Sequence, residues 1–156
     1  MVSYLGREKK NKRGNVDIDK LYTRETSEAG AWCEITDPLG AETGLKFKIA
    51  GAHSDKFRRA MTKAQAKQLN RERARGRKDV TPEDLELEFD LMADVLADCT
   101  LEWNAEKDGK DWPCNAENAR TVYLNAPDVR RQVFQFASDA RHYFLSPSSA
   151  DASESE

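Results

Sequence analysis

Residues 45–58 read LKFKIAGAHSDKFR, and this stretch decides the fold because it predicts the end of a strand and the start of a helix. Its first half alternates apolar and basic side chains, as half-buried strands do, with apolar residues at Leu45, Phe47 and Ile49. Ser54 then suits the N-cap of a helix, and Asp55 lies in its first turn. The sequence therefore predicts a strand and a helix within one domain.

A partner for this strand lies upstream. Residues 31–36, AWCEIT, are strand-like, and the DPLG sequence at 37–40 supplies turn residues. The connection is longer than a two-residue hairpin loop. We expect residues 31–36 and 45–50 to form a β-hairpin.

Two helices of opposite charge are predicted next. A basic helix runs from Ser54 to about Arg75, and Thr81 and Pro82 open an acidic helix that reaches about Cys99. The expected buried stripe of the acidic helix is Leu85, Phe89, Met92, Leu96 and Cys99. Antiparallel packing would bring the two charged faces together, although each exposed ion pair contributes only about 0–1 kcal/mol.

The C-terminal third adds two more helices. LEWN at 101–104 reads as a short extended segment, and Asp108 and Gly109 as a turn. Asn115 is placed to cap a helix over 116–125, and Pro127 starts another that extends to 144. The predicted fold is α+β and mainly α, with an N-terminal β-hairpin followed by about four helices in one small domain. We expect its core to include Phe89, Trp103 and Phe136.

The chain has 156 residues, the size of one domain. We divide it into a flexible basic arm at 1–27, a folded domain at 28–145 and a disordered acidic tail at 146–156. The net charge of −3 gives no global field that favours nucleic acid or a membrane. No apolar run approaches the roughly 18 residues of a membrane span, and no apolar signal-peptide region follows the basic start. We expect a soluble, intracellular protein.

Few residues in the sequence point to catalysis or metal binding. The sequence lacks the common phosphate-binding, dinucleotide-binding, zinc-protease and nucleophile-elbow motifs. Cys33, Cys99 and Cys114 are far apart, and His53 and His142 do not complete a zinc-ligand spacing. Cys114 has no general base close to it in sequence. We therefore expect no enzymatic activity, no cofactor and no metal.

The basic helix offers the main candidate surface. Ten Lys and Arg residues lie between 56 and 78. They either form a solvated helix face or recognise an acidic partner. Nucleic acid is disfavoured because the acidic helix competes for this face and the interleaved aromatics are few. The candidate partner-binding residues are Arg71, Arg73, Arg75, Arg77 and Trp112.

Three motifs in order carry a resemblance. They are KIAGAHSDKFRR at 48–59, LEW at 101–103 with DGKDWPCNAENA at 108–119, and PDVRRQVFQFASDARHYFL at 127–145. In this order and spacing the chain resembles the tail assembly chaperones of long-tailed bacteriophages over roughly residues 28–145. It departs from the family at Cys114 and Asn115, where an aromatic residue and a serine cap are common. Asparagine caps a helix as well as serine does.

The resemblance implies a non-catalytic helper in the host bacterial cytoplasm. Such proteins bind the tape measure protein, keep it soluble, help to recruit tail tube subunits and are often absent from the mature virion. The sequence leaves open whether the chain forms a homo-oligomer. Two alternatives remain at this point: a structural virion component of the tail or head–tail connector, and a basic-helix nucleic-acid-binding protein.

Overall fold

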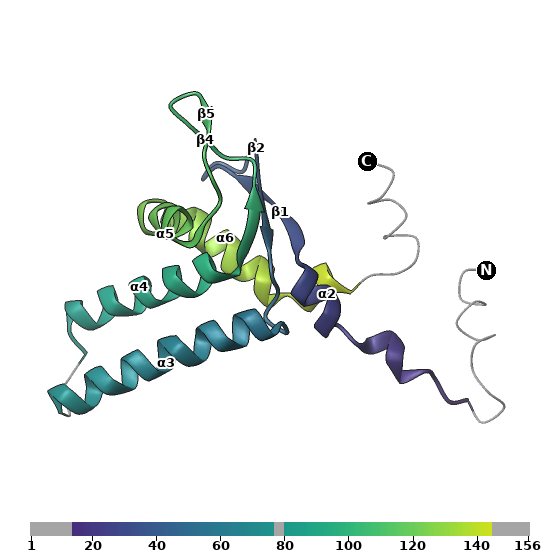
Figure 1. Cartoon of the computed structure of the whole chain (residues 1–156), viewed down its shortest axis with the longest axis horizontal. Helices are drawn as coiled ribbons and strands as arrows, with labels where there is room; N and C mark the ends of the chain where they lie inside the picture. The colour runs from purple at the N-terminus through teal and green to yellow at the C-terminus, as the bar shows by residue number, and fades with distance from the viewer. Residues whose placement is uncertain (1–13, 77–79, 145–156) are drawn as a thin grey trace.

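The structure is a computed structural model that describes residues 14–76 and 80–144. Figure 1 shows two long helices beside a small sheet, with the two shorter C-terminal helices on the same side of the sheet. In chain order the elements are η1 (Ile18–Leu21), α2 (Arg24–Ala29), β1 (Ala31–Thr36), β2 (Glu42–Ile49), α3 (Asp55–Arg75), α4 (Pro82–Cys99), β3 (Thr100–Trp103), β4 (Glu106–Lys107), β5 (Lys110–Asp111), α5 (Ala116–Asn125), α6 (Pro127–Ser138) and η2 (Ala140–Tyr143). The described part of the chain is mainly helical with small antiparallel sheets, which agrees with an α+β class.

The main sheet has three antiparallel strands in the order β1–β2–β3. It is not an isolated hairpin at the start of the fold, because η1 and α2 precede it and β3 pairs with β2. Helix α2 contains the buried Ser27, so the boundary predicted between arm and domain falls inside a helix. The basic cluster expected in the first 13 residues and the tail expected after 145 lie outside the described residues.

The predicted helix starts are confirmed. Ser54 Oγ accepts a hydrogen bond from the Phe57 amide at 3.1 Å, and Asn115 Oδ1 accepts one from the Asn118 amide at 2.8 Å. Thr81 and Asp84 form a reciprocal capping box at the start of α4. The turn at Asp108 and Gly109 is also present: both residues have positive φ, 55° and 77°, as a two-residue turn between paired strands requires.

The last helix ends earlier than predicted. Helix α6 stops at Ser138 instead of continuing to 144, and the short helix η2 follows. Asp139 adopts an extended conformation, and its side chain accepts a hydrogen bond from the Arg141 amide at 3.0 Å. This local side-chain bond competes with continuation of the helix. The turn lets Tyr143 fold back into the protein, where it is buried.

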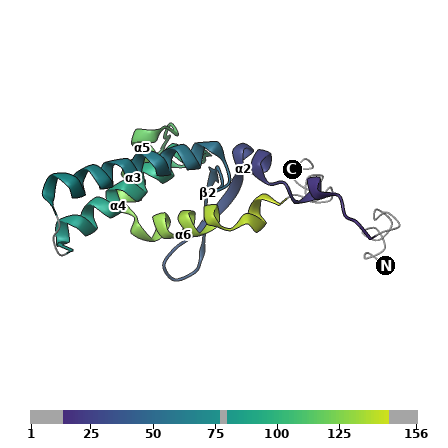
Figure 2. The same ribbon diagram turned by 90° about the horizontal axis from the view of Figure 1, so that it is seen from below.

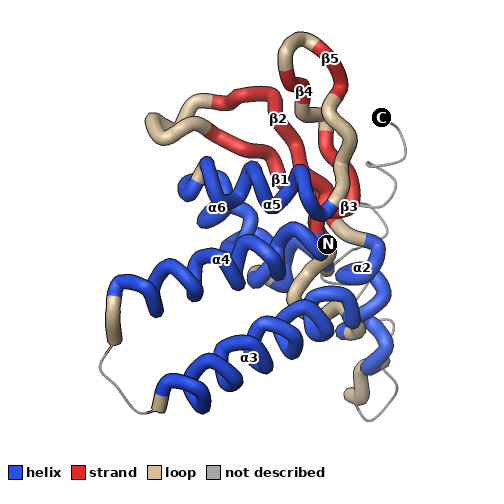
Figure 3. Tube along the Cα trace, turned by 60° about the vertical axis from the view of Figure 1, so that its left-hand side comes forward, coloured by secondary structure: helices blue, strands red, loops and turns tan. Residues whose placement is uncertain are grey.

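Helices α3 and α4 pack antiparallel, as the opposite charges of their sequences predict (Figures 1 and 3). Seen from below, α6 lies beside this pair (Figure 2). The stripe predicted for α4 is only half correct. Leu96 and Cys99 are buried, but Leu85 and Phe89 are about half exposed, so Phe89 is not a core residue. Trp103 and Phe136 are partly buried and pack against the core.

The segment between β2 and α3 joins the elements of the domain. The Ala50 amide donates to Cys99 O, the Gly51 amide to Ser27 O and the Ala52 amide to Ala137 O, all at 2.9 Å. These bonds tie the segment to α4, α2 and α6. Tyr143 adds a bond just before this segment, because its hydroxyl donates to Ile49 O at the end of β2 at 3.0 Å. We call residues 50–54 the corner segment.

Gly51 leaves no room for a side chain. A Cβ atom there would lie 2.8 Å from Tyr143 Cε2 and 2.9 Å from Ser27 Oγ. Ser54 completes the turn, since its hydroxyl donates to Gly51 O at 2.6 Å while capping α3. Glycine is therefore required for the close approach of α2 and η2.

We predict that Gly51→Ala destabilises the protein by about 1–3 kcal/mol, because the added methyl group overpacks the corner. Urea unfolding followed by circular dichroism measures this. In a Tyr143→Ala background the cost of Gly51→Ala should be clearly smaller, since the ring that blocks the methyl group is gone. An equal loss of unfolding free energy in both backgrounds would contradict the close contact between Gly51 and the Tyr143 ring.

Candidate partner-binding groove

The core of the domain ends halfway along the α3–α4 pair. On α3 no residue beyond Ala64 belongs to the core, and on α4 no residue before Leu91 does. The reason lies in the sequence, because Leu69 is the only large apolar residue in the last ten positions of α3. The far halves of the two helices therefore lack side chains that could fill the space between them.

A groove of about 1050 Å³ occupies this space. Its apolar lining comes from Leu69 on α3, Val80 before α4 and Leu87 on α4. Charged residues form its walls, with Arg71, Glu72, Arg73 and Arg75 on the α3 side and Asp84 and Glu88 on the α4 side. We call this the distal groove.

A second apolar strip lies on another side of α4. Leu85 and Phe89 follow one another by one turn, and they are 48% and 51% exposed. Each is two residues from Leu87 of the distal groove, so it lies roughly 160° from Leu87 around the helix. The Arg130 guanidinium of α6 lies 4.8 Å from the centre of the Phe89 ring, a cation–π contact. The far half of α4 thus exposes apolar side chains on two separate faces.

Asp84 dominates the electrostatics of the groove. It pairs with Arg75, lies 3.7 Å from Arg71 Nε and accepts the Thr81 amide at 2.8 Å. The Thr81 backbone bond first and Arg75 second hold the pKa of the Asp84 carboxyl below its ordinary value. Arg71 Nε is buried and makes no hydrogen bond within the described chain. Arg71 and Arg75 are therefore turned toward α4 and do not form an open basic patch.

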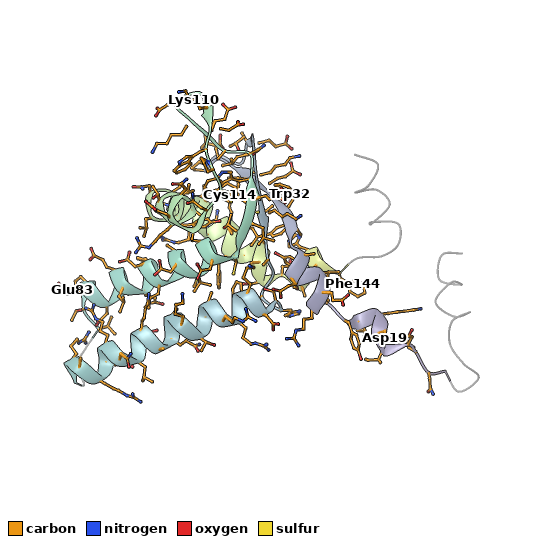
Figure 4. All side chains as sticks on the ribbon, viewed as in Figure 1. Asp19, Trp32, Glu83, Lys110, Cys114 and Phe144 are labelled. Carbon is orange, nitrogen blue, oxygen red and sulfur yellow. The ribbon has the colours of Figure 1, made fainter. Side chains whose placement is uncertain are left out.

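The candidate residues from the sequence do not form one site. Arg73 is exposed on the groove wall, and Arg77 lies outside the described residues. Trp112 follows the β4–β5 hairpin, which Figure 4 places far from the α3–α4 end, as the labels Lys110 and Glu83 show. It stacks on Trp103 with ring centres 5.3 Å apart, and Trp103 Nε1 donates to Trp112 O at 2.6 Å. Trp112 thus packs against the sheet.

The groove itself was not predicted from the sequence. Leu85 and Phe89 were assigned to the core because they fit the helical period. The helical period alone carried no signal of their exposure, because Phe89 meets the charged Arg130 of α6 and not an apolar partner.

Burial suppresses the chemistry of the cysteines. It raises the pKa of the Cys33 thiol to about 11 and that of Cys99 to about 12, and it also raises the pKa of Cys114. The thiols are therefore held in the protonated form, which is a poor nucleophile. Within residues 14–76 and 80–144, no group of three or more His, Cys, Asp or Glu side chains could hold a metal ion.

Comparisons with known proteins identify no relative of this chain. No protein-family model matches the chain, and neither the curated proteins nor the solved structures contain a significant match. Among the described helices, none has both the length and the apolar character that crossing a membrane requires.

We predict that acid weakens the pairing of α3 and α4 through Asp84. Because its folded-state pKa is below the ordinary value, its stabilisation is complete above about pH 4 and is lost as pH falls through the lowered pKa. Asp84→Asn should lower the thermal midpoint at neutral pH and flatten its fall between about pH 5 and pH 2.

Circular dichroism melts across this pH range measure the effect. Glu86→Gln is the matched control, since Glu86 is an exposed carboxylate of the same helix. A variant at Asp84 with the same pH profile as the Glu86 control would contradict the role given to Asp84.

Proposed function

We propose that the chain is a non-catalytic tail assembly chaperone of a long-tailed bacteriophage. It binds the tape measure protein in the host bacterial cytoplasm, keeps it soluble and helps to recruit tail tube subunits. The three ordered sequence motifs support this assignment, and the distal groove is the observation that carries it.

A chaperone of this kind needs an apolar surface inside a charged surround. The distal groove offers Leu69, Val80 and Leu87 to a client, and charged walls stand on both sides. Outside the groove, α3 is predominantly basic and α4 predominantly acidic, so a bound client would be surrounded by solvated charge. This combination covers apolar surface and keeps the complex in solution.

The geometry of the groove favours a helical client. Two antiparallel helices border it, and an amphipathic helix binds such a groove through side chains spaced three and four residues apart. A long helical protein such as a tape measure protein would offer many such stripes. Phe89 and Leu85 would offer a second contact on another side of α4.

We predict that co-expression with this chain keeps the tape measure protein soluble, and that Leu69→Glu with Phe89→Glu abolishes the effect. Glutamate is a good helix former, and both positions are about half exposed, so the fold should survive. Loss of two apolar anchors should weaken binding at least about tenfold, which corresponds to about 1.4 kcal/mol or more. Pull-down from the soluble fraction measures the complex.

Leu39→Glu is the matched control, because Leu39 is 95% exposed in the β1–β2 connection, outside the groove. Full solubilisation by the double variant would contradict the use of this surface. Stoichiometric presence of the chain in purified virions would instead favour a structural tail component. Salt-dependent duplex binding lost on substitution of Arg71 and Arg73 would favour the nucleic-acid alternative.

A further inference from the structure

Residues 14–22, which we call the arm segment, carry a second exposed apolar cluster. Val16, Ile18, Leu21 and Tyr22 are all at least 58% exposed, and η1 contains no buried residue. Asp17 caps η1 by accepting the Asp19 amide at 3.0 Å, so these apolar side chains are held on a defined turn. A turn with four exposed apolar side chains and no buried residue is typical of a docking element.

The arm segment and the distal groove are complementary. The groove offers apolar side chains between an acidic α4 wall and an α3 wall that is mainly basic but also contains Glu72, and the arm segment combines apolar side chains with both signs of charge. The carboxylates of Asp17 and Asp19 are opposite in charge to Arg73 on the α3 wall. The ammonium group of Lys20 is opposite in charge to Glu88 on the α4 wall. Neither Arg73 nor Glu88 forms an ion pair within the part of the chain that the structure describes.

The two elements lie at opposite ends of the molecule. Figure 4 shows Asp19 of the arm segment at one end and Glu83 of the first turn of α4 at the other. Thr23 and Arg24 tie the chain to the start of α3, through the Thr23 Oγ1–His53 Nδ1 contact at 2.6 Å and the Arg24–Asp55 ion pair at 2.5 Å.

This anchor prevents the whole cluster from docking within one chain. Leu69 is 14 residues beyond Asp55, about 21 Å along the helix. Leu21 and Tyr22 are within two residues of Thr23 and can reach less than about 8 Å from it. Leu21 and Tyr22 therefore cannot enter the distal groove of their own chain, and only another copy's groove can take all four side chains.

We propose that the distal groove of one copy receives the arm segment of a second copy. Each copy then uses its groove toward one neighbour and its arm segment toward another. Such a head-to-tail contact between different surfaces generates an open chain or a closed ring. The assembly covers both apolar clusters of every internal copy.

The inference concerns the same groove as the proposed function but does not rest on the identity of the client. A client helix and a neighbour's arm segment compete for one groove. Self-assembly would therefore protect the apolar lining before the client is made, and the client would release the copies by displacing the arm segments.

Light scattering on the purified full-length chain, without a client, tests the proposal. We expect the mean mass of the particles to exceed that of one chain and to rise with protein concentration up to roughly 1 mM. Ile18→Glu with Leu21→Glu removes the arm contact, and Leu69→Glu removes the groove contact. Each variant alone should be monomeric, while Leu39→Glu should assemble like the unchanged protein.

Mixing the two variants gives the decisive result. The arm variant keeps an intact groove and the groove variant keeps an intact arm segment, so one junction can form between them. We expect the mixture to reach the mass of two chains and no more. A monomeric unchanged protein, an assembling single variant, or a mixture that stays monomeric would each overturn the inference.

These outcomes are separable from those of the proposed function. Assembly that fails while Leu69→Glu with Phe89→Glu still blocks client solubilisation would remove only the inference. Co-expression that leaves the tape measure protein insoluble, while the mixture forms two-chain particles, would remove only the proposed function. Helix content measured by circular dichroism shows that each variant is folded.

Discussion

The close approach at Gly51 is the constraint on which the rest of the structure depends. Three successive amides, from Ala50 to Ala52, donate to carbonyls on α4, α2 and α6, and Tyr143 lies directly against the glycine. Buried backbone groups need partners, so these bonds leave the three helices little freedom of position. Ser54 then starts α3 at a defined angle from the same turn. The corner segment thus fixes one end of α3 against the body of the domain.

The groove follows from this one-sided anchoring. Packing against the core holds α3 as far as Ala64, and beyond that point ion pairs with α4 replace apolar contacts. Exposed or half-exposed ion pairs set geometry and contribute little stability. The far halves of α3 and α4 are therefore held together mainly by Asp84 and its arginines, with space left between them. A partner helix or arm segment that filled this space would supply the apolar contacts that the two helices lack.

Local signals in the sequence predict much of the fold. Ser54, Thr81 and Asn115 mark helix starts because a side-chain oxygen at these positions satisfies a free amide, whatever the tertiary context. Contacts that are distant in sequence, or local side-chain bonds, determine the features that were predicted wrongly. The period of α4 includes Phe89, but its ring meets the charged Arg130 of α6 and no apolar layer covers it, so it is about half exposed. Likewise α6 ends at Ser138 because Asp139 bonds locally, and the boundary predicted after residue 27 falls inside α2, where Ser27 is buried.

The central claim is that the corner segment forms the rigid part of the protein and the distal groove its contact surface. Hydrogen exchange measured by mass spectrometry, with and without the tape measure protein, tests it most directly. The corner segment should exchange slowly in both states, while amides of residues 68–75 and 82–89 should exchange faster alone and slow down when the client binds. Protection that appears only at the β4–β5 hairpin, with the far halves of α3 and α4 unchanged, would contradict the account.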